Sequence, residues 1–227
     1  MTEKRRVIID EISAIPKLKR RSMMCVLGVV ICAISVGLFK RAAFGVDPFQ
    51  TFMAGLDAII PISFGTLYVI ANICLLFFSL IFDRHFIGLG TFINLFLTGY
   101  IADYSHKFLL YIFPELGIAG RAVCLIIGIV IMCLASAIYF TADLGVSTYD
   151  AVALIISGTW NVWQFKFVRV TTDLVCVIIG VVLFLMAGNS WGLVPTIAGI
   201  GTIVTAFFMG PLIDFFNRRV AIPMLNK

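Results

Sequence analysis

Three long apolar runs constrain this chain more than any other feature of its sequence. The runs 23–39, 122–140 and 170–187 contain no lysine, arginine or glutamate, and Asp173 is their only acidic residue. Apolar runs of about 18 or more residues predict helices that cross a membrane. Only 13% of the chain is charged, roughly half the share typical of a soluble domain, so most of its surface cannot face water. The sequence therefore predicts an all-α protein that crosses the membrane several times.

The basic residues are concentrated near the N-terminus. Of the 17 lysines and arginines, seven lie within the first 21 positions. Basic residues beside membrane spans favour the cytoplasmic side and attract anionic lipid headgroups. We predict a basic cytoplasmic segment over 1–21 that contacts anionic lipids, and a cytoplasmic C-terminal tail over 217–227. The part over 7–15 fits either a short surface helix or a partly ordered tail, and the charge pattern does not indicate nucleic-acid binding.

No metal or cofactor pattern occurs along the chain. The six cysteines lie within apolar runs and form no C-x-x-C pair, which fits buried thiols better than disulfides or metal ligands. His85 and His106 lie at the ends of different segments. We predict no metal, no cofactor and no catalytic group, although Asp150 and Asp173 leave an intramembrane acid pair as a minor alternative.

The chain contains two similar sixteen-residue stretches. They are GLGTFINLFLTGYIAD, which begins at Gly88, and GIGTIVTAFFMGPLID, which begins at Gly199. The matches are mainly glycine, threonine and aspartate, and further matches precede them in the same order, among them Asn72 with Asp173. Internal repeats of this kind are common in transporters. We predict a duplication of about 100 residues, with one repeat over 22–113 and the other over 121–216.

Each repeat is predicted to form four helical segments, of which the second is short. The segments are 22–40, 48–60, 64–82 and 87–104 in the first repeat, and 121–140, 147–158, 165–187 and 195–215 in the second. About twelve residues give about 18 Å of helix, against a hydrocarbon core of about 30 Å. The short segment either crosses a thinned bilayer or enters and turns back, which gives six to eight membrane-embedded helices.

The relative direction of the two repeats depends on those short segments. If all segments cross, the repeats are parallel, with fourteen basic residues on the cytoplasmic side and three on the other; if the short segments turn back, the repeats are inverted and the counts are thirteen and four. Asp103 precedes Lys107 by four residues, as Asp214 precedes Arg218. A cationic end of the same helix in both repeats favours the parallel arrangement.

Two similar motifs each predict that a helix starts after a break in the chain. They are GVDPFQ, which begins at Gly45, and GVSTYD, which begins at Gly145. Asp47 and Ser147 are good N-cap residues, and Gln50 and Asp150 follow three residues later, as in a capping box. In transporters, such mid-membrane helix starts point their positive ends at anionic groups of the ligand. Two equivalent starts that face one cavity would form a solute site, and Asp150 would add a titratable acid.

The glycine motifs have two interpretations. Either their small residues permit close helix contact in lipid, or an unwound Gly-x-Gly with its threonine lines a permeation path. The glycines assigned to packing or hinges are Gly45, Gly88, Gly90, Gly145, Gly199 and Gly201.

Charged groups within the spans also mark a candidate site, because hydrocarbon penalises them by about 2.5–3.5 kcal/mol on insertion scales. Arg169 and Asp173 lie four apart on one helix face and either pair near the membrane surface or leave Asp173 to accept a proton or cation. The candidate solute-binding residues are Asp47, Gln50, Asn72, Thr91, Ser147, Thr148, Asp150, Arg169, Asp173 and Thr202.

At these motifs the chain resembles the YczE/YyaS/YitT family of bacterial integral membrane proteins, and most of all its YczE branch. The resemblance covers nearly all of 22–216 and is carried by GVDPFQTFMAGL, GVSTYDAVALIIS, FVRVTTD and GIGTIVTAFFMGPLID. It implies the same membrane architecture and a bacterial inner-membrane location, and it implies no mechanism.

We therefore expect a small secondary transporter or exporter of an unknown solute, with its site between the two repeats, and not an enzyme. The alternative is a non-transporting membrane partner that acts on another protein through its basic N-terminal segment. A homo-oligomer is compatible with either function.

Overall fold

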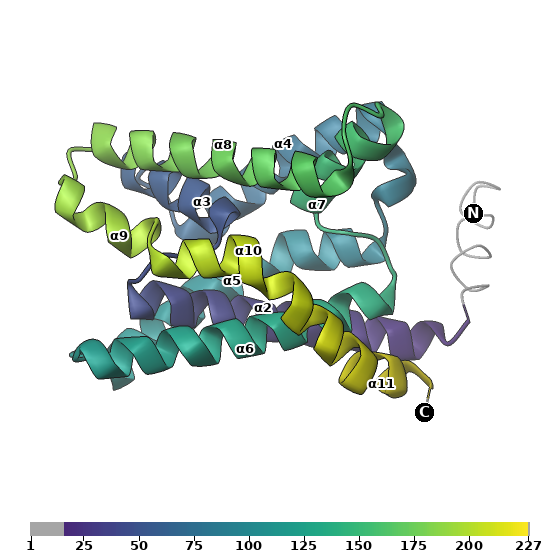
Figure 1. The fold of residues 1–227 in the computed structure, drawn as a ribbon, viewed down its shortest axis with the longest axis horizontal. Helices are drawn as coiled ribbons and strands as arrows, with labels where there is room; N and C mark the ends of the chain where they lie inside the picture. The colour runs from purple at the N-terminus through teal and green to yellow at the C-terminus, as the bar shows by residue number, and fades with distance from the viewer. Residues whose placement is uncertain (1–15, 227) are drawn as a thin grey trace.

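The protein is a bundle of helices, seen here in a computed structural model that describes residues 16–226 apart from the side chain of Lys166 (Figure 1). Within this range the elements are helical and no strand occurs. The elements are α2 (Leu18–Ala42), α3 (Pro48–Ile59), α4 (Phe64–Phe82), η1 (Arg84–Phe86), α5 (Leu89–Ile112), α6 (Ile118–Ala142), α7 (Thr148–Leu154), η2 (Ile155–Thr159), α8 (Phe165–Met186), η3 (Trp191–Leu193), α9 (Val194–Ile197), α10 (Ile200–Phe216), η4 (Asn217–Ala221) and α11 (Ile222–Asn226). The predicted all-α fold is confirmed.

Three segments differ most from the sequence prediction. Helix α5 continues to Ile112, eight residues beyond the predicted end at 104. The last predicted segment, 195–215, is divided into α9 and α10 by an extended backbone at Gly199. The division has a cause elsewhere in the chain, because the backbone N–H groups of Gly45 and Val46 donate to carbonyls of α9. Residues 217–226, predicted as a tail, continue α10 as the helical turns η4 and α11.

Five stretches of the described chain are long and apolar enough to cross a membrane. They are Leu18–Ala42, Phe64–Phe82, Ile118–Ala142, Phe167–Met186 and Trp191–Asn226. Helix α5 is more polar, but its 24 residues give about 36 Å of helix, and it packs along α2, where Ser105 meets Gly37 and Cys25 lies beside Gly90. The chain is a multi-pass membrane protein.

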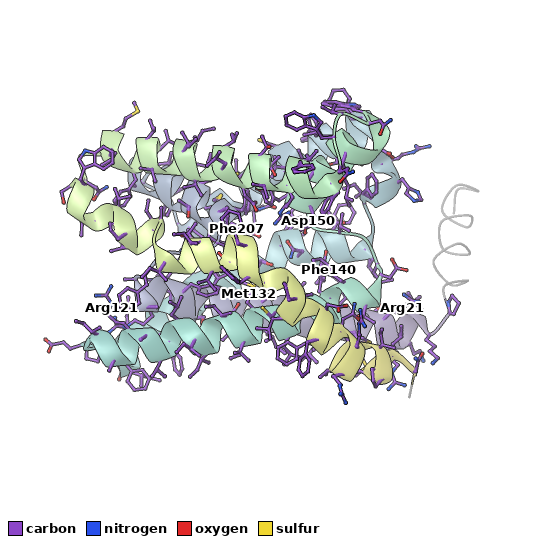
Figure 2. All side chains as sticks on the ribbon, in the orientation of Figure 1. Arg21, Arg121, Met132, Phe140, Asp150 and Phe207 are labelled. Carbon is purple, nitrogen blue, oxygen red and sulfur yellow. The ribbon has the colours of Figure 1, made fainter. Side chains whose placement is uncertain are left out.

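Helices α2 and α6 run antiparallel along each other. The Arg21 guanidinium at the start of α2 donates to the Ala142 carbonyl at the end of α6 (3.0 Å). In return, Arg121 near the start of α6 donates to the Ala42 carbonyl at the end of α2 (2.7 Å). The two arginines lie at opposite ends of the molecule in Figure 2. The first helices of the two halves therefore point in opposite directions, and the favoured parallel arrangement is wrong.

The inversion follows from the length of α3. Its 12 residues span about 18 Å, too short to cross the hydrocarbon core. Only α2, α4 and α5 run the length of the first half. Because three is an odd number of crossings, the second half begins on the opposite side and runs in the opposite direction. Charge counting missed this because both arrangements leave a similar excess of basic residues on one side.

Contacts between the halves are reciprocal at equivalent positions. The Gly90 N–H donates to the Leu144 carbonyl (2.6 Å), and the Gly201 N–H donates to the Phe44 carbonyl (2.7 Å). Helix α3 of the first half packs on α8 of the second, and α7 of the second half packs on α4 of the first. These pairs relate the halves by an approximate two-fold axis. A common ancestry of the two halves stays a prediction.

The motif glycines lie where these backbones meet. Gly45 (φ 95°) and Gly145 (φ 101°) adopt the left-handed conformation that favours glycine. A Cβ on Gly45 would overlap the backbone of Gly199, and one on Gly145 would overlap that of Gly88. The close contact of these backbones therefore agrees with the packing interpretation of the glycines, and a role in permeation stays a prediction.

Both ends of the described chain lie at the same end of the molecule. Lys17 Nζ donates to the Leu225 carbonyl (3.0 Å). The two expected i,i+4 ion pairs are also present, Asp103 with Lys107 and Asp214 with Arg218. The first fifteen residues of the predicted basic segment lie outside the described range.

Candidate functional site

The starts of α3 and α7 meet near the middle of the molecule. Asp47 and Ser147 cap the two helices as predicted, since Asp47 Oδ1 accepts from the Gln50 N–H (3.1 Å) and Ser147 Oγ from the Asp150 N–H (3.1 Å). The rings of Phe49 and Tyr149, two residues after each cap, stack with centroids 4.9 Å apart. From this point α3 and α7 run toward opposite ends (Figure 1). Two short helices thus begin face to face.

A cavity of about 390 Å³ lies beside these two helix starts. Its volume is at the lower end of the range for small-molecule pockets. Residues from both halves line it, and Met132 and Asp150 among them lie near the middle of the view in Figure 2. The charged residues of the lining are Asp47, Asp150, Arg169 and Asp173, and its uncharged polar residues include Gln50, Asn72, Asn94, Thr98, Ser136, Ser147 and Thr205.

Arg169 ties two of the three carboxylates together. Its guanidinium forms a very short contact with Asp150 Oδ1, and its Nε lies 3.4 Å from Asp173 Oδ1. The Tyr149 hydroxyl donates to Asp173 (2.6 Å), and the guanidinium lies over the Tyr149 ring at 4.5 Å. This Arg169 network, which consists of Tyr149, Asp150, Arg169 and Asp173, holds α7 against α8 through charge-assisted bonds.

The first half has a neutral counterpart of the network. Asn72, which aligns with Asp173, accepts a hydrogen bond from the Thr148 hydroxyl (2.5 Å) and donates to the Tyr68 carbonyl (2.8 Å). By the same offset Tyr68 occupies the position of Arg169. The two halves therefore use equivalent positions to hold α7, but only the second half does so with charge.

Three buried polar atoms of the lining have no hydrogen-bond partner within the described part of the chain. They are Gln50 Oε1, Thr98 Oγ1 and the Tyr139 hydroxyl, and all three side chains are more than nine-tenths buried. An unpartnered buried polar group costs about 1–3 kcal/mol, so these atoms indicate that water or a ligand belongs in the cavity. The expected capping boxes are wrong, because Gln50 Oε1 makes no return bond and Asp150 accepts from the Ser147 hydroxyl instead (2.7 Å).

Of the ten candidate residues, seven line the cavity and three do not. Thr148 is buried against Asn72. Thr91 donates to the Val146 carbonyl (2.6 Å) and accepts from the Gly88 N–H, while Thr202 accepts from the Gly199 N–H (3.2 Å). The two motif threonines therefore cap α5 and α10 and do not line the cavity.

Several lining residues were not among the sequence candidates. Asn94 and Thr98 lie four apart on one face of α5, and Ser136 and Tyr139 lie on α6. The sequence signal for these four residues is an uncharged polar group inside an apolar helix, with no charge, helix cap or repeated motif to mark it. Which side a single polar residue faces depends on how its helix is rotated against its neighbours.

Among the described residues, the cavity lining extends toward one end of the molecule. This lining reaches Phe140 near the end of α6 and Phe165 at the start of α8, and both are 45% exposed. At the opposite end the equivalent positions are closed, since Phe64 is only 4% exposed and Lys40 Nζ lies over its ring. The open end is the one that holds Arg21 and the described chain termini.

The family and the two relatives to which this chain is similar carry names without an activity. The model described as "Family of unknown function (DUF6198)" matches residues 19–218. The chain is 27% identical over 201 residues to the "Uncharacterized membrane protein YczE" of Bacillus subtilis (strain 168), which covers 88% of this chain and 86% of that protein. It is 25% identical over 204 residues to the "Uncharacterized protein YyaS" of the same organism, with 88% and 94% covered. No solved structure matches significantly. The expected resemblance to YczE and YyaS is confirmed.

Proposed function

We propose that the chain, which belongs to DUF6198, a family of unknown function, is a secondary transporter or exporter of a small solute. The observation that carries the proposal is the cavity between the facing starts of α3 and α7, lined by both halves and open toward one end. Discontinuous helices that meet near mid-membrane in an inverted pair of repeats are the common design of secondary-transporter sites. The role is binding and passage of a solute, without catalysis.

The asymmetry between the two ends supports an alternating-access mechanism. Phe165 is exposed where its equivalent Phe64 is packed under Lys40. In an inverted pair of repeats, each repeat can adopt the conformation that the other one has. This exchange closes the open end and opens the closed end around the same site. The present arrangement then corresponds to one of the two end states.

The charge distribution supports a cytoplasmic orientation of the open end. Lys17, Lys19, Arg20, Arg21, Arg218 and Arg219 lie at or next to that end, and Lys40, Arg41, Lys107 and Arg121 at the other. Basic residues favour the cytoplasmic side. Both termini would then be cytoplasmic in a bacterial inner membrane, and the cavity would open inward.

The test is solute flux in proteoliposomes, with tetraethylammonium, alanine, succinate and glycerol as radiolabelled cationic, zwitterionic, anionic and neutral probes. We expect at least one probe to enter faster than in protein-free vesicles. Asp150→Asn and Asp173→Asn should each slow that entry by about tenfold or more, because each removes a charge of the lining. Asp214→Asn on the exposed part of α10 is the matched control and should keep the wild-type rate.

Two outcomes contradict these assignments. If no probe enters faster than in protein-free vesicles, the transport proposal is overturned. If both variants move the probe at the wild-type rate, the cavity is not the site of passage.

The accessory-protein alternative depends mainly on residues 1–15, which lie outside the described range. Within it, Lys17 and Arg21 bond to carbonyls of the chain itself. Deletion of 1–15 with retention of flux would favour transport over the alternative.

A further inference from the structure

We propose that the cavity binds a small organic monocation, with the Asp47 carboxylate as its counter-ion. This inference rests on the proposed transport function and specifies the substrate class. The sequence interpretation had expected an anionic ligand group at the two helix starts, and the geometry of the site points to the opposite charge.

The protein's own side chains accept from one backbone N–H at each helix start. Asp47 Oδ1 accepts the Gln50 N–H in the first turn of α3, and Ser147 Oγ accepts the Asp150 N–H in the first turn of α7. Asp47 and Asp150 also place negative charge at the positive ends of both helices, where the dipoles stabilise it. The positive potential of the helix starts is therefore compensated by the protein's own side chains.

The lining has an excess of negative charge. It contains three carboxylates and one guanidinium, and Arg169 pairs with Asp150 and Asp173. Asp47 lines the same cavity, and no ion pair involves it within residues 16–226. A carboxylate in a membrane interior is unfavourable without a partner, so a cationic ligand supplies the charge that the protein omits.

The remaining walls favour an organic cation over a metal ion. Phe49 and Tyr149 stack beside Asp47, and Tyr68 meets Phe49 edge-on with centroids 5.8 Å apart. The Tyr149 ring is already covered by Phe49 and the Arg169 guanidinium, so the rings of Phe49 and Tyr68 are the ones that would attract an ammonium group through cation–π contacts. Among the described residues no group of three or more His, Cys, Asp and Glu side chains is arranged to hold a metal. The unpartnered Gln50 Oε1 is a hydrogen-bond acceptor, and the Thr98 and Tyr139 hydroxyls offer both roles.

The test compares three probes that share a phenyl ring and differ in charge: benzyltrimethylammonium, 2-phenylethanol and phenylacetate. Binding to the full-length protein in lipid nanodiscs is measured by titration calorimetry. We expect benzyltrimethylammonium to bind at least about tenfold more tightly than either of the others, because only it neutralises Asp47. This comparison uses wild-type protein and needs no variant.

Asp47→Asn should then weaken benzyltrimethylammonium binding by about tenfold or more while it leaves 2-phenylethanol binding unchanged. Asparagine is as good an N-cap as aspartate, so α3 keeps its start. The control Asp214→Asn should bind benzyltrimethylammonium as the wild type does. Size-exclusion profiles in nanodiscs check that each variant is folded.

The outcomes separate this inference from the transport proposal. Tighter binding of phenylacetate, no binding of benzyltrimethylammonium, or equal binding by Asp47→Asn overturns the inference, even if another probe crosses the membrane. Charge-selective binding without flux of any probe leaves the inference standing and overturns transport.

Discussion

Arg169→Ala is expected to lower the stability of the folded protein by about 3 kcal/mol or more and to abolish solute flux. The guanidinium is the shared partner of Asp150 and Asp173, whose side chains are 20% and 10% exposed. Removal of one partner from a buried ion pair costs about 3–5 kcal/mol, since the remaining charge is left uncompensated. Thermal unfolding of the purified protein, followed by intrinsic fluorescence, measures the loss of stability.

A triple variant tests whether unpaired charge causes the loss of stability in Arg169→Ala. Arg169→Gln combined with Asp150→Asn and Asp173→Asn removes the whole charge network and should recover most of the stability, but not the flux. The control Arg218→Ala, whose side chain is 75% exposed, should change stability by less than about 1 kcal/mol, as for surface ion pairs. An Arg169→Ala protein as stable as the wild type would show that the network does not hold α7 against α8.

Gly55→Leu is expected to prevent folding, and Gly55→Ala to destabilise the protein by about 1–3 kcal/mol. Helices α3 and α8 cross at Gly55 and Gly180, and a Cβ on Gly55 would overlap the carbonyl oxygen of Gly180. Since the obstacle is backbone, the two helices must separate to make room. The same thermal unfolding measurement, together with the yield of monodisperse protein, tests both variants.

Gly210→Ala is the matched control, because a Cβ there meets nothing within 4 Å. It should be neutral or stabilise the helix by up to about 1 kcal/mol. Equal unfolding temperatures for Gly55→Ala and Gly210→Ala would contradict the close α3–α8 crossing.

The sequence predicts much of the local structure correctly. The bounds of the 64–82 segment agree with α4, because an apolar run bounded by Ser63 and Asp83 has clear ends. The two helix starts are found at Asp47 and Ser147, since N-capping is a short-range interaction within a few residues. The break at Gly199 was not predicted, because its cause is the backbone at 45–46.

The direction of the second half was predicted incorrectly from a local pattern. Asp103–Lys107 and Asp214–Arg218 look equivalent in sequence, and each forms its ion pair. They nevertheless lie at opposite ends of the molecule. Helix α5 runs parallel to α2 and α10 runs parallel to α6, whereas α2 and α6 are antiparallel. Charge bias acts on the whole chain, and one pair at each end is too little to determine orientation.

The candidate site was predicted best where charge or a helix cap marked it. Asp47, Asp150 and Asp173 line the cavity, whereas Thr91 and Thr202 use their hydroxyls for local caps. A sequence gives the chemistry of a side chain, but whether its hydroxyl is already satisfied depends on backbone groups that folding brings near.

Transport by alternating access requires that one cavity between two inverted halves opens in turn to each side of the membrane. Cys32 lines that cavity, and its Sγ lies 3.3 Å from Met132 Sδ of the other half. A protein that keeps Cys32 and has its other five cysteines replaced by alanine is treated with an impermeant trimethylammonium-bearing methanethiosulfonate, either in intact cells or in inside-out vesicles. A variant without Cys32 gives the background reaction. Alternating access predicts modification of Cys32 from both sides, whereas modification from one side only, or from neither, would contradict it.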